Sequence, residues 1–293
     1  MHIIRYGDRA AAASAAVALD GRTGGIPGIE RISDLAMMHL SEIRQRCADT
    51  VLVAGEISAG ELLAPVDGSM EVWAAGVTYR WSRDARVEES SGFSDVYARV
   101  YDAPRPELFF KSTAWRVAGH GTPIAIRDDS QVDVPEPELA LVVNRYGEVF
   151  GYTVCNDVSS RTIEGENPLY LPQAKVFLGG CAVGPAIRPA WEIDDPYNLT
   201  IELTILRAGS VVWQGSASTS QLKRRFDELV EYLFRADEFP HGVVLSTGTC
   251  LVPDLPFSLQ AADVVRIGIS EVGVLENPVV RGKHDMLDHV GHP

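Results

Sequence analysis

The chain has 293 residues, of which 46% are apolar and 23% charged, a balance typical of a globular protein with a sizeable core. Its net charge of −14 at pH 7 argues against nucleic acid or an anionic membrane as a binding partner. The four cysteines are scattered without a CxxC pair, so we expect reduced thiols and a cytoplasmic location.

Residues 1–68 are predicted to form a small N-terminal domain, and residues 69–293 a larger one. Two short apolar strands are expected within residues 2–20, and the apolar spacing over residues 31–46 predicts a helix. The turn-rich stretch that contains LLAPVDG then marks the boundary between the two domains.

The second domain is predicted to be mostly β with a few helices, in the α+β class, because no repeating βαβ pattern is present. Strands are expected at MEVWAAG and RPELFFKST, separated by a polar helical excursion over residues 80–100 that could act as a lid. NPLYLPQAK is interpreted as a loop, and the alternation in TIELTILRAGSVVWQG predicts a hairpin that turns at Ala208-Gly209. The apolar stripe over Gln221–Phe234 predicts a helix with Ser220 as its N-cap.

Three carboxylates in the middle of the chain indicate a metal site. Glu136 and Glu138 are two residues apart at the start of an apolar run, so on a strand they project from the same face. A turn at Tyr146-Gly147 and a second apolar run could bring Asp157 beside them. Three converging carboxylates repel one another unless a cation lies between them, and a hard divalent cation is the simplest one.

Six motifs occur in a fixed order: GVTY, RPELFFK, PEPELALVV, GYTVCNDVSSR, AKVFLGG and STGT. In order and spacing they resemble the fumarylacetoacetate hydrolase superfamily over about residues 70–280. Within it, YDAPRPELFFKSTAWRVAGHGTPI and ENPLYLPQAK resemble the branch that dehydrates 2-keto-3-deoxy sugar acids. The resemblance implies a C-terminal domain of mixed β-roll type, one divalent metal ion per subunit and a homodimer or homotetramer assembled through that domain.

The resemblance also assigns roles to individual residues. The three carboxylates become the metal ligands, with Mg²⁺ expected, although oxygen-rich sites also accept Mn²⁺ and Ca²⁺. The lysine of the family falls on Lys175, and the glutamate of the dehydratase branch falls on Glu107. The threonine that contacts the substrate falls on Thr249.

One departure from the family pattern favours elimination over hydrolysis. Hydrolytic and decarboxylating members have a histidine and a glutamate after the first strand of this domain, as a water-activating pair. Here the stretch is TYRWSRDARVEE, with Ser82 in the histidine place and Ala85 in the glutamate place. Tyr79, Ser82, Arg83 and Arg86 are the remaining candidates for substrate contacts, and the two arginines could equally be surface charges.

We therefore expect a Mg²⁺-dependent dehydratase, with 2-keto-3-deoxy-D-arabinonate as substrate and 2,5-dioxopentanoate as product. The metal would acidify C3–H and stabilise the enolate, which then expels the C4 hydroxyl. Lys175, with its pKa lowered by burial and by the cation, is the expected base and Glu107 the expected acid, and these roles could be exchanged. The alternatives are an acylpyruvate hydrolase or oxaloacetate decarboxylase, and a non-catalytic protein stabilised by a metal. As ordinary surface features, the two glutamates would lie on a solvated edge and Lys175 and Glu107 would be exposed.

Overall fold

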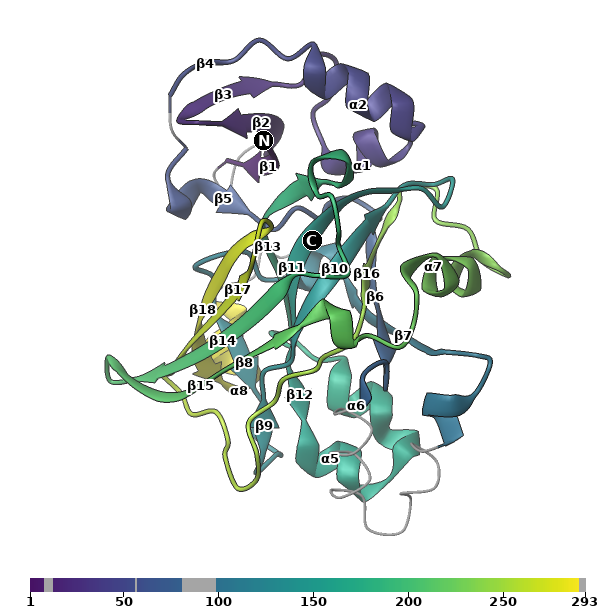
Figure 1. Cartoon of the computed structure of the whole chain (residues 1–293). Helices are drawn as coiled ribbons and strands as arrows, with labels where there is room; N and C mark the ends of the chain where they lie inside the picture. The colour runs from purple at the N-terminus through teal and green to yellow at the C-terminus, as the bar shows by residue number, and fades with distance from the viewer. Residues whose placement is uncertain (8–12, 56, 81–98, 290–293) are drawn as a thin grey trace.

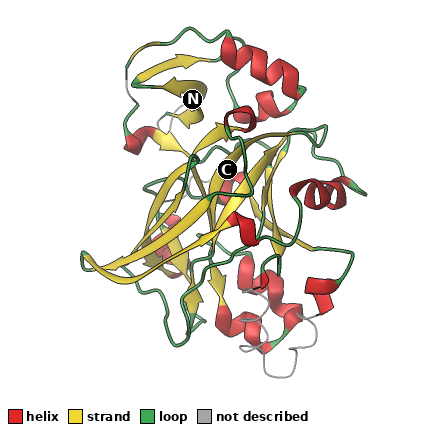
Figure 2. Ribbon diagram, in the orientation of Figure 1, coloured by secondary structure: helices red, strands yellow, loops and turns green. Residues whose placement is uncertain are grey.

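The structure, a computed structural model, describes residues 1–7, 13–55, 57–80 and 99–289 (Figure 1). Strands dominate it (Figure 2). The N-terminal strands and helices gather at one end of the molecule, at the top of Figure 1, away from the helices labelled α5 and α6. Among the described residues, no helix has the length and hydrophobicity needed to span a membrane.

The largest sheet of the described chain has eleven strands. Ten follow one path, and the eleventh, β5, pairs with β1 beside it. In spatial order, with β5 given after its partner, they are β4 (Val53–Ala54), β3 (Arg22–Gly25), β2 (Ser14–Leu19), β1 (His2–Tyr6), β5 (Leu62–Leu63), β13 (Cys181–Pro189), β11 (Val149–Asp157), β10 (Pro137–Val143), β16 (Val243–Ser246), β6 (Glu71–Gly76) and β7 (Glu107–Thr113).

A second sheet packs beside the first and has five strands within the described residues. In spatial order these are β15 (Ser210–Ser218), β14 (Thr200–Arg207), β17 (Val264–Ile269), β18 (Gly273–Arg281) and β8 (Ile124–Ile126). The short strands β9 (Asp133–Val134) and β12 (Ser159–Ser160) pair separately. The described helices are α1 (Ile32–Ala36), α2 (Leu40–Ala48), α5 (Arg161–Glu166), α6 (Leu171–Lys175), α7 (Phe226–Phe234) and α8 (Gly282–Leu287).

Strand β10 is buried on both faces, which explains its nearly continuous apolar sequence. Successive side chains point to opposite faces. Leu139 and Leu141 therefore enter the large core between the two sheets, whereas Ala140 and Val142 enter a second core shared with the N-terminal helices. The carboxylates at the start of this strand are consequently buried as well.

Three predicted elements differ from the structure. The single helix predicted over residues 31–46 is two helices, because the Leu40 amide donates to the Glu148 carboxylate at 2.9 Å, which caps α2 at its start. The helix predicted from Gln221 begins only at Phe226. The residues before Phe226 are not helical, because Leu222 forms a β-bridge with Tyr79. The N-cap of α7 is therefore Arg225 and not Ser220.

The third difference concerns NPLYLPQAK, which was interpreted as a loop. It forms a 3₁₀ turn followed by α6, and Lys175 is the last residue of that helix. The strands predicted at residues 71–76 and 107–113 are confirmed, as is the hairpin between β14 and β15. The domain boundary near residue 68 stays a prediction, and the large sheet runs across it where Ile3 of β1 pairs with Ile187 of β13.

Candidate metal centre and its cavity

Glu136, Glu138 and Asp157 form a compact buried group. Glu138 is directly opposite Cys155 in the β10–β11 pair, and the Asp157 amide donates to the Glu136 carbonyl at 3.0 Å. This register places all three side chains on one face of the sheet. Each offers an oxygen within 4.8 Å of the others, and none is more than 2% exposed. A solvated edge is therefore the wrong interpretation of the two glutamates.

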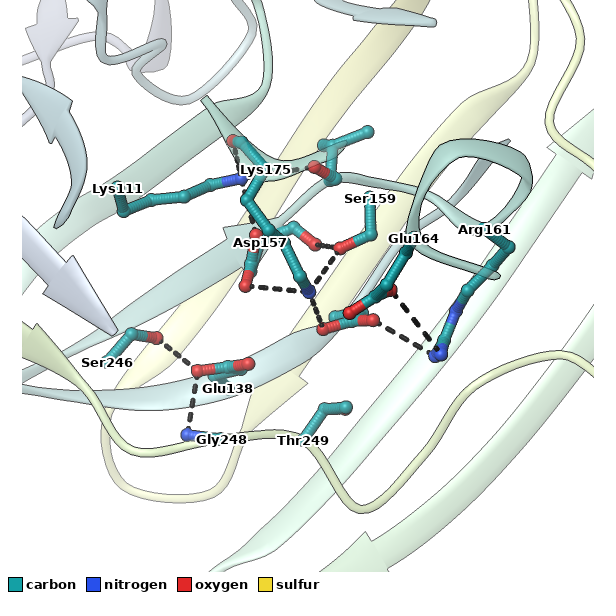
Figure 3. Close-up of polar contacts among 12 residues, drawn as sticks. Lys111, Glu138, Asp157, Ser159, Arg161, Glu164, Lys175, Ser246, Gly248 and Thr249 are labelled. Atoms are coloured by element: carbon teal, nitrogen blue, oxygen red, sulfur yellow. Dashed lines mark hydrogen bonds and ion pairs between the residues drawn. The ribbon is translucent and has the colours of Figure 1, made fainter. Parts of the chain in front are cut away.

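Lys175 joins two of these carboxylates from the end of α6. Its Nζ donates to Glu136 Oε2 at 2.7 Å and to Asp157 Oδ2 at 3.1 Å (Figure 3). A third bond, at 2.6 Å, connects it to Ser159 Oγ. The residue is 2% exposed, so its interpretation as an exposed surface lysine is also wrong.

Two further buried cations contact the same group. The Lys111 ammonium, from β7, pairs with Asp157 and donates to the Val158 carbonyl at 3.1 Å and to the carbonyl of Lys175. Arg161, the first residue of α5, lies 3.0 Å from Glu136 through its Nη2. These cations offset part of the repulsion among the carboxylates.

Glu138 is held by neutral donors. The Ser246 hydroxyl donates to its Oε2 at 2.5 Å and the Gly248 amide donates at 2.8 Å (Figure 3). Burial, with the nearby charge of Asp157 and to a lesser extent of Glu136, raises the pKa of the Glu138 carboxyl well above its usual value. A divalent cation among the three carboxylates would favour the ionised form instead.

The formal charges of the site match a divalent cation. Among the described residues five carboxylates line the cavity and three cations contact members of that set, so the formal charges of these eight side chains sum to −2 when all are ionised. The carboxylates are Glu107, Glu136, Glu138, Asp157 and Glu164, and the cations are Lys111, Arg161 and Lys175. The oxygen-only donor set is also the one that hard cations prefer. The residues present therefore fit a divalent metal ion.

Glu107 reaches this cavity across a glycine. It pairs with Gly76 in the β6–β7 register, and a Cβ on Gly76 would lie 2.2 Å from Glu107 Oε2. Glu107, Lys175 and Thr249 all line the cavity. The Thr249 hydroxyl is 3.1 Å from the carbonyl of Pro137, the residue between Glu136 and Glu138.

Of the other predicted substrate contacts only Tyr79 is among the described residues, and it does not line this cavity. Tyr79 is completely buried in the core between the sheets, where burial raises the pKa of its hydroxyl well above the usual value. Ser82, Arg83 and Arg86 lie outside the described residues, as does most of the predicted helical excursion.

Three charged residues of the site were not predicted from the sequence: Lys111, Arg161 and Glu164. Lys111 closes an apolar run, FFK, in which a lysine on a buried strand signals a partner of opposite charge. Arg161 and Glu164 follow the NDVSS stretch directly, at a spacing that places both on one helical face. This i, i+3 spacing, directly after the motif that contains Asp157, was the sequence signal for a charged pair close to the expected metal site.

Comparisons with known proteins agree with this geometry. The model of the fumarylacetoacetate (FAA) hydrolase C-terminal family matches residues 71–280. A probable 2-keto-3-deoxyxylonate dehydratase of Haloferax volcanii is 52% identical over 215 residues, 73% of each chain. The 2-dehydro-3-deoxy-D-arabinonate dehydratase of Saccharolobus solfataricus is 42% identical over 255 residues, 83% of this chain and 85% of that one. A solved 2-keto-3-deoxy-D-arabinonate dehydratase, complexed with magnesium and 2,5-dioxopentanoate, superimposes with a TM-score of 0.84 at 35% identity, covering 97% of this chain and all of the other.

Proposed function

This chain belongs to the fumarylacetoacetate hydrolase family, and on that premise we propose that it is a Mg²⁺-dependent hydro-lyase that converts a 2-keto-3-deoxypentonate into 2,5-dioxopentanoate and water. The observation that carries the proposal is the buried group of three carboxylates that shares one cavity with Lys175 and Glu107. The similar dehydratases, one of them complexed with magnesium and 2,5-dioxopentanoate, support the same reaction.

The names of the two similar dehydratases, one for a xylonate and one for an arabinonate derivative, are compatible with a single substrate. Pentonates of the D series differ only at C2 and C3. Both centres lose their configuration when C2 becomes a keto group and C3 a methylene group. The D forms of the two compounds are therefore one molecule with a single stereocentre at C4, and 2-keto-3-deoxy-D-arabinonate is the proposed substrate.

The residues of the cavity divide the work as follows. Glu136, Glu138 and Asp157 would hold the divalent cation, which when bound supplies Lewis acidity to a 2-keto carboxylate. Lys175 Nζ lies against two of these ligands and removes the C3 proton. Glu107, at the start of β7, donates a proton to the departing C4 hydroxyl.

The runner-up function is hydrolysis of an acylpyruvate or decarboxylation of oxaloacetate. It requires a base that activates water, and Ser82 and Ala85 stand where other family members have the histidine and glutamate that do so. A non-catalytic, metal-stabilised protein could use Lys175 as a counter-charge, but it would not need the further carboxylate of Glu107 on the same cavity. Both alternatives are therefore ranked below the dehydratase.

Assembly and location are part of the proposal. A homodimer or homotetramer is supported by β15, an uncharged strand at the edge of the five-stranded sheet, with Val211 52% exposed and Val212 41% exposed. A V211K variant should sediment as a smaller species than the wild type, and an unchanged size would contradict self-association through this strand.

The net charge of −14 argues against nucleic-acid or membrane partners, and four buried free cysteines suit the cytoplasm.

The direct test offers the purified protein 2-keto-3-deoxy-D-arabinonate, acetylpyruvate and oxaloacetate in parallel with Mg²⁺. Aldehyde should form from the sugar acid alone, and chelation should abolish its formation. Cleavage of acetylpyruvate without aldehyde from the sugar acid would contradict the proposal.

The E107Q variant tests the acid role of Glu107. It should lose about 100-fold or more in turnover with Mg²⁺ still bound. Near-normal turnover of E107Q would remove Glu107 from the mechanism.

A further inference from the structure

The proposed reaction, on which this inference rests, breaks C–H bonds at two different carbons. Loss of water between C3 and C4 leaves an unsaturated keto acid that still carries its hydroxyl on C5. To become 2,5-dioxopentanoate, this compound must lose one proton from C5 and one from its hydroxyl, and gain one proton at C3 and one at C4. Lys175 and Glu107 serve the first stage. The C5 proton needs a base of its own.

The cavity offers one more group of this kind among its described lining residues. Apart from the three metal-ligand carboxylates, the titratable side chains on its wall are Glu107, Lys175 and Glu164. Two of these already have a role in the elimination. Glu164 remains, and its carboxylate points from α5 toward the group around Lys175 (Figure 3).

Local structure holds Glu164 firmly in this place. It lies in the first turn of α5, which Ser160 caps by accepting a hydrogen bond from the Ile163 amide at 3.2 Å. The helix is tied to the preceding segment because the Arg161 amide donates to the Val132 carbonyl at 2.8 Å. Glu164 is 5% exposed, and Arg161 Nη1, 3.8 Å away, gives its carboxylate a counter-charge in that buried position.

We infer that Glu164 is a third proton-transfer residue, which removes the proton from C5 after water has left. With this group the proton balance closes. Lys175 takes a proton from C3 and Glu107 gives one to the departing hydroxyl. Glu164 then takes the C5 proton while Lys175 returns its own proton to C3, which moves the double bond between C4 and C5. Finally Glu164 gives its proton to C4, and the C5 hydroxyl proton returns to Glu107.

Each of the three groups ends this sequence as it began, and the net change is the loss of one water molecule. The assignment also separates the two halves of the reaction in the protein. Elimination would depend on Lys175 and Glu107, and conversion of the unsaturated acid would depend in addition on Glu164. If Glu164 only neutralised Arg161, its loss would affect both halves of the reaction alike.

The test is E164Q, which keeps an amide oxygen near Arg161 and removes the base. Starting from 2-keto-3-deoxy-D-arabinonate with Mg²⁺, ultraviolet absorbance of the conjugated keto acid and trapping of the aldehyde are followed together. E164Q should release water at a rate within about 10-fold of the wild type and form aldehyde at least about 100-fold more slowly. The unsaturated acid should therefore accumulate, and wild-type enzyme added afterwards should consume it.

Controls make each outcome decisive. E166Q changes an exposed glutamate on the same helix and should form aldehyde like the wild type, without accumulation. The E164D variant retains a carboxylate base, but in a displaced position. With this variant, deuterium at C5 of the substrate should slow aldehyde formation without slowing water loss. If E164Q loses its fold or its Mg²⁺, accumulation of the unsaturated acid is measured with E164D instead.

Two results would overturn the inference. One is aldehyde formation by E164Q at the wild-type rate. The other is an equal loss of elimination and aldehyde formation in both variants with no unsaturated acid, which would mean a structural role. If the wild type itself forms neither product from the sugar acid, the proposed function fails instead, so the two failures are distinguishable.

Discussion

At the scale of single residues, Lys175 combines two effects that can be measured separately. Its ammonium lies beside Glu136 and Asp157, so it competes with a metal ion for their charge, and in the proposed reaction the neutral amine of the same side chain accepts the C3 proton. Replacing it with methionine removes both effects while keeping most of the side-chain volume. The consequences for turnover and for metal affinity should therefore have opposite signs.

We expect K175M to reduce turnover by about 10²- to 10⁴-fold and to bind Mg²⁺ at least as tightly as the wild type, because a positive charge has been removed from the site. Turnover assays at saturating Mg²⁺ and calorimetric titration of Mg²⁺ measure the two effects. K283M, at an exposed lysine, is the control and should change neither. Weakened Mg²⁺ binding with normal turnover would show that Lys175 only supports the site.

Asp133 provides a prediction about pH. Burial is the main cause that raises the pKa of this carboxyl to about 6 from 3.8. Because the folded state then binds a proton more tightly than the unfolded state, the contribution of Asp133 to stability is fully present below pH 3.8 and is lost as the pH rises through about 6. The complete loss is on the order of 3 kcal/mol in the free energy of unfolding.

The D133N variant should therefore lose less stability than the wild type between pH 5 and pH 8, by about 1–2 kcal/mol, in urea unfolding at the two pH values. D129N is the matched control, since Asp129 is exposed and Arg127 lowers the pKa of its carboxyl. This control should keep the wild-type pH dependence. Parallel curves for D133N and the wild type would contradict the role of Asp133.

At the scale of elements, the pairing of β6 with β7 positions Glu107, the proposed catalytic acid. Gly76 leaves the space that the Glu107 carboxylate occupies. G76A should therefore displace Glu107 and reduce turnover by about 10-fold or more while Mg²⁺ binding persists, because the metal ligands are on other strands. G25A is the control, since a Cβ there meets no atom within 4 Å. Full activity of G76A would mean that Glu107 does not work from this position.

Elements also show what the sequence could and could not predict. The carboxylate group was predictable because a strand repeats every two residues and a short turn returns the chain, so Glu136, Glu138 and Asp157, the proposed metal ligands, meet through local rules. The start of α2 was not predictable, because the carboxylate that caps it comes from Glu148, far along the chain. Lys111 reaches the site through the same kind of distant contact.

The whole molecule should respond to metal as a single folding unit. A ligand that binds only the folded state stabilises it by about 2.7 kcal/mol at 100 times its Kd, which for a chain of this size corresponds to a rise of about 5 °C in Tm. Mg²⁺ should produce such a rise, EDTA should reverse it, and E138Q should reduce it strongly. Thermal unfolding followed by circular dichroism measures this shift. An identical rise in E138Q would exclude Glu138 as a ligand.

Lys111 has a consequence for how the protein acquires its metal. Together with Arg161 and Lys175 it cancels three of the five negative charges around the cavity. We therefore expect a newly made chain to complete its fold before any metal arrives, and the ion to enter and leave a finished site. Loading then follows the free Mg²⁺ concentration of the cell, so the supply of this ion becomes a control on flux through the reaction.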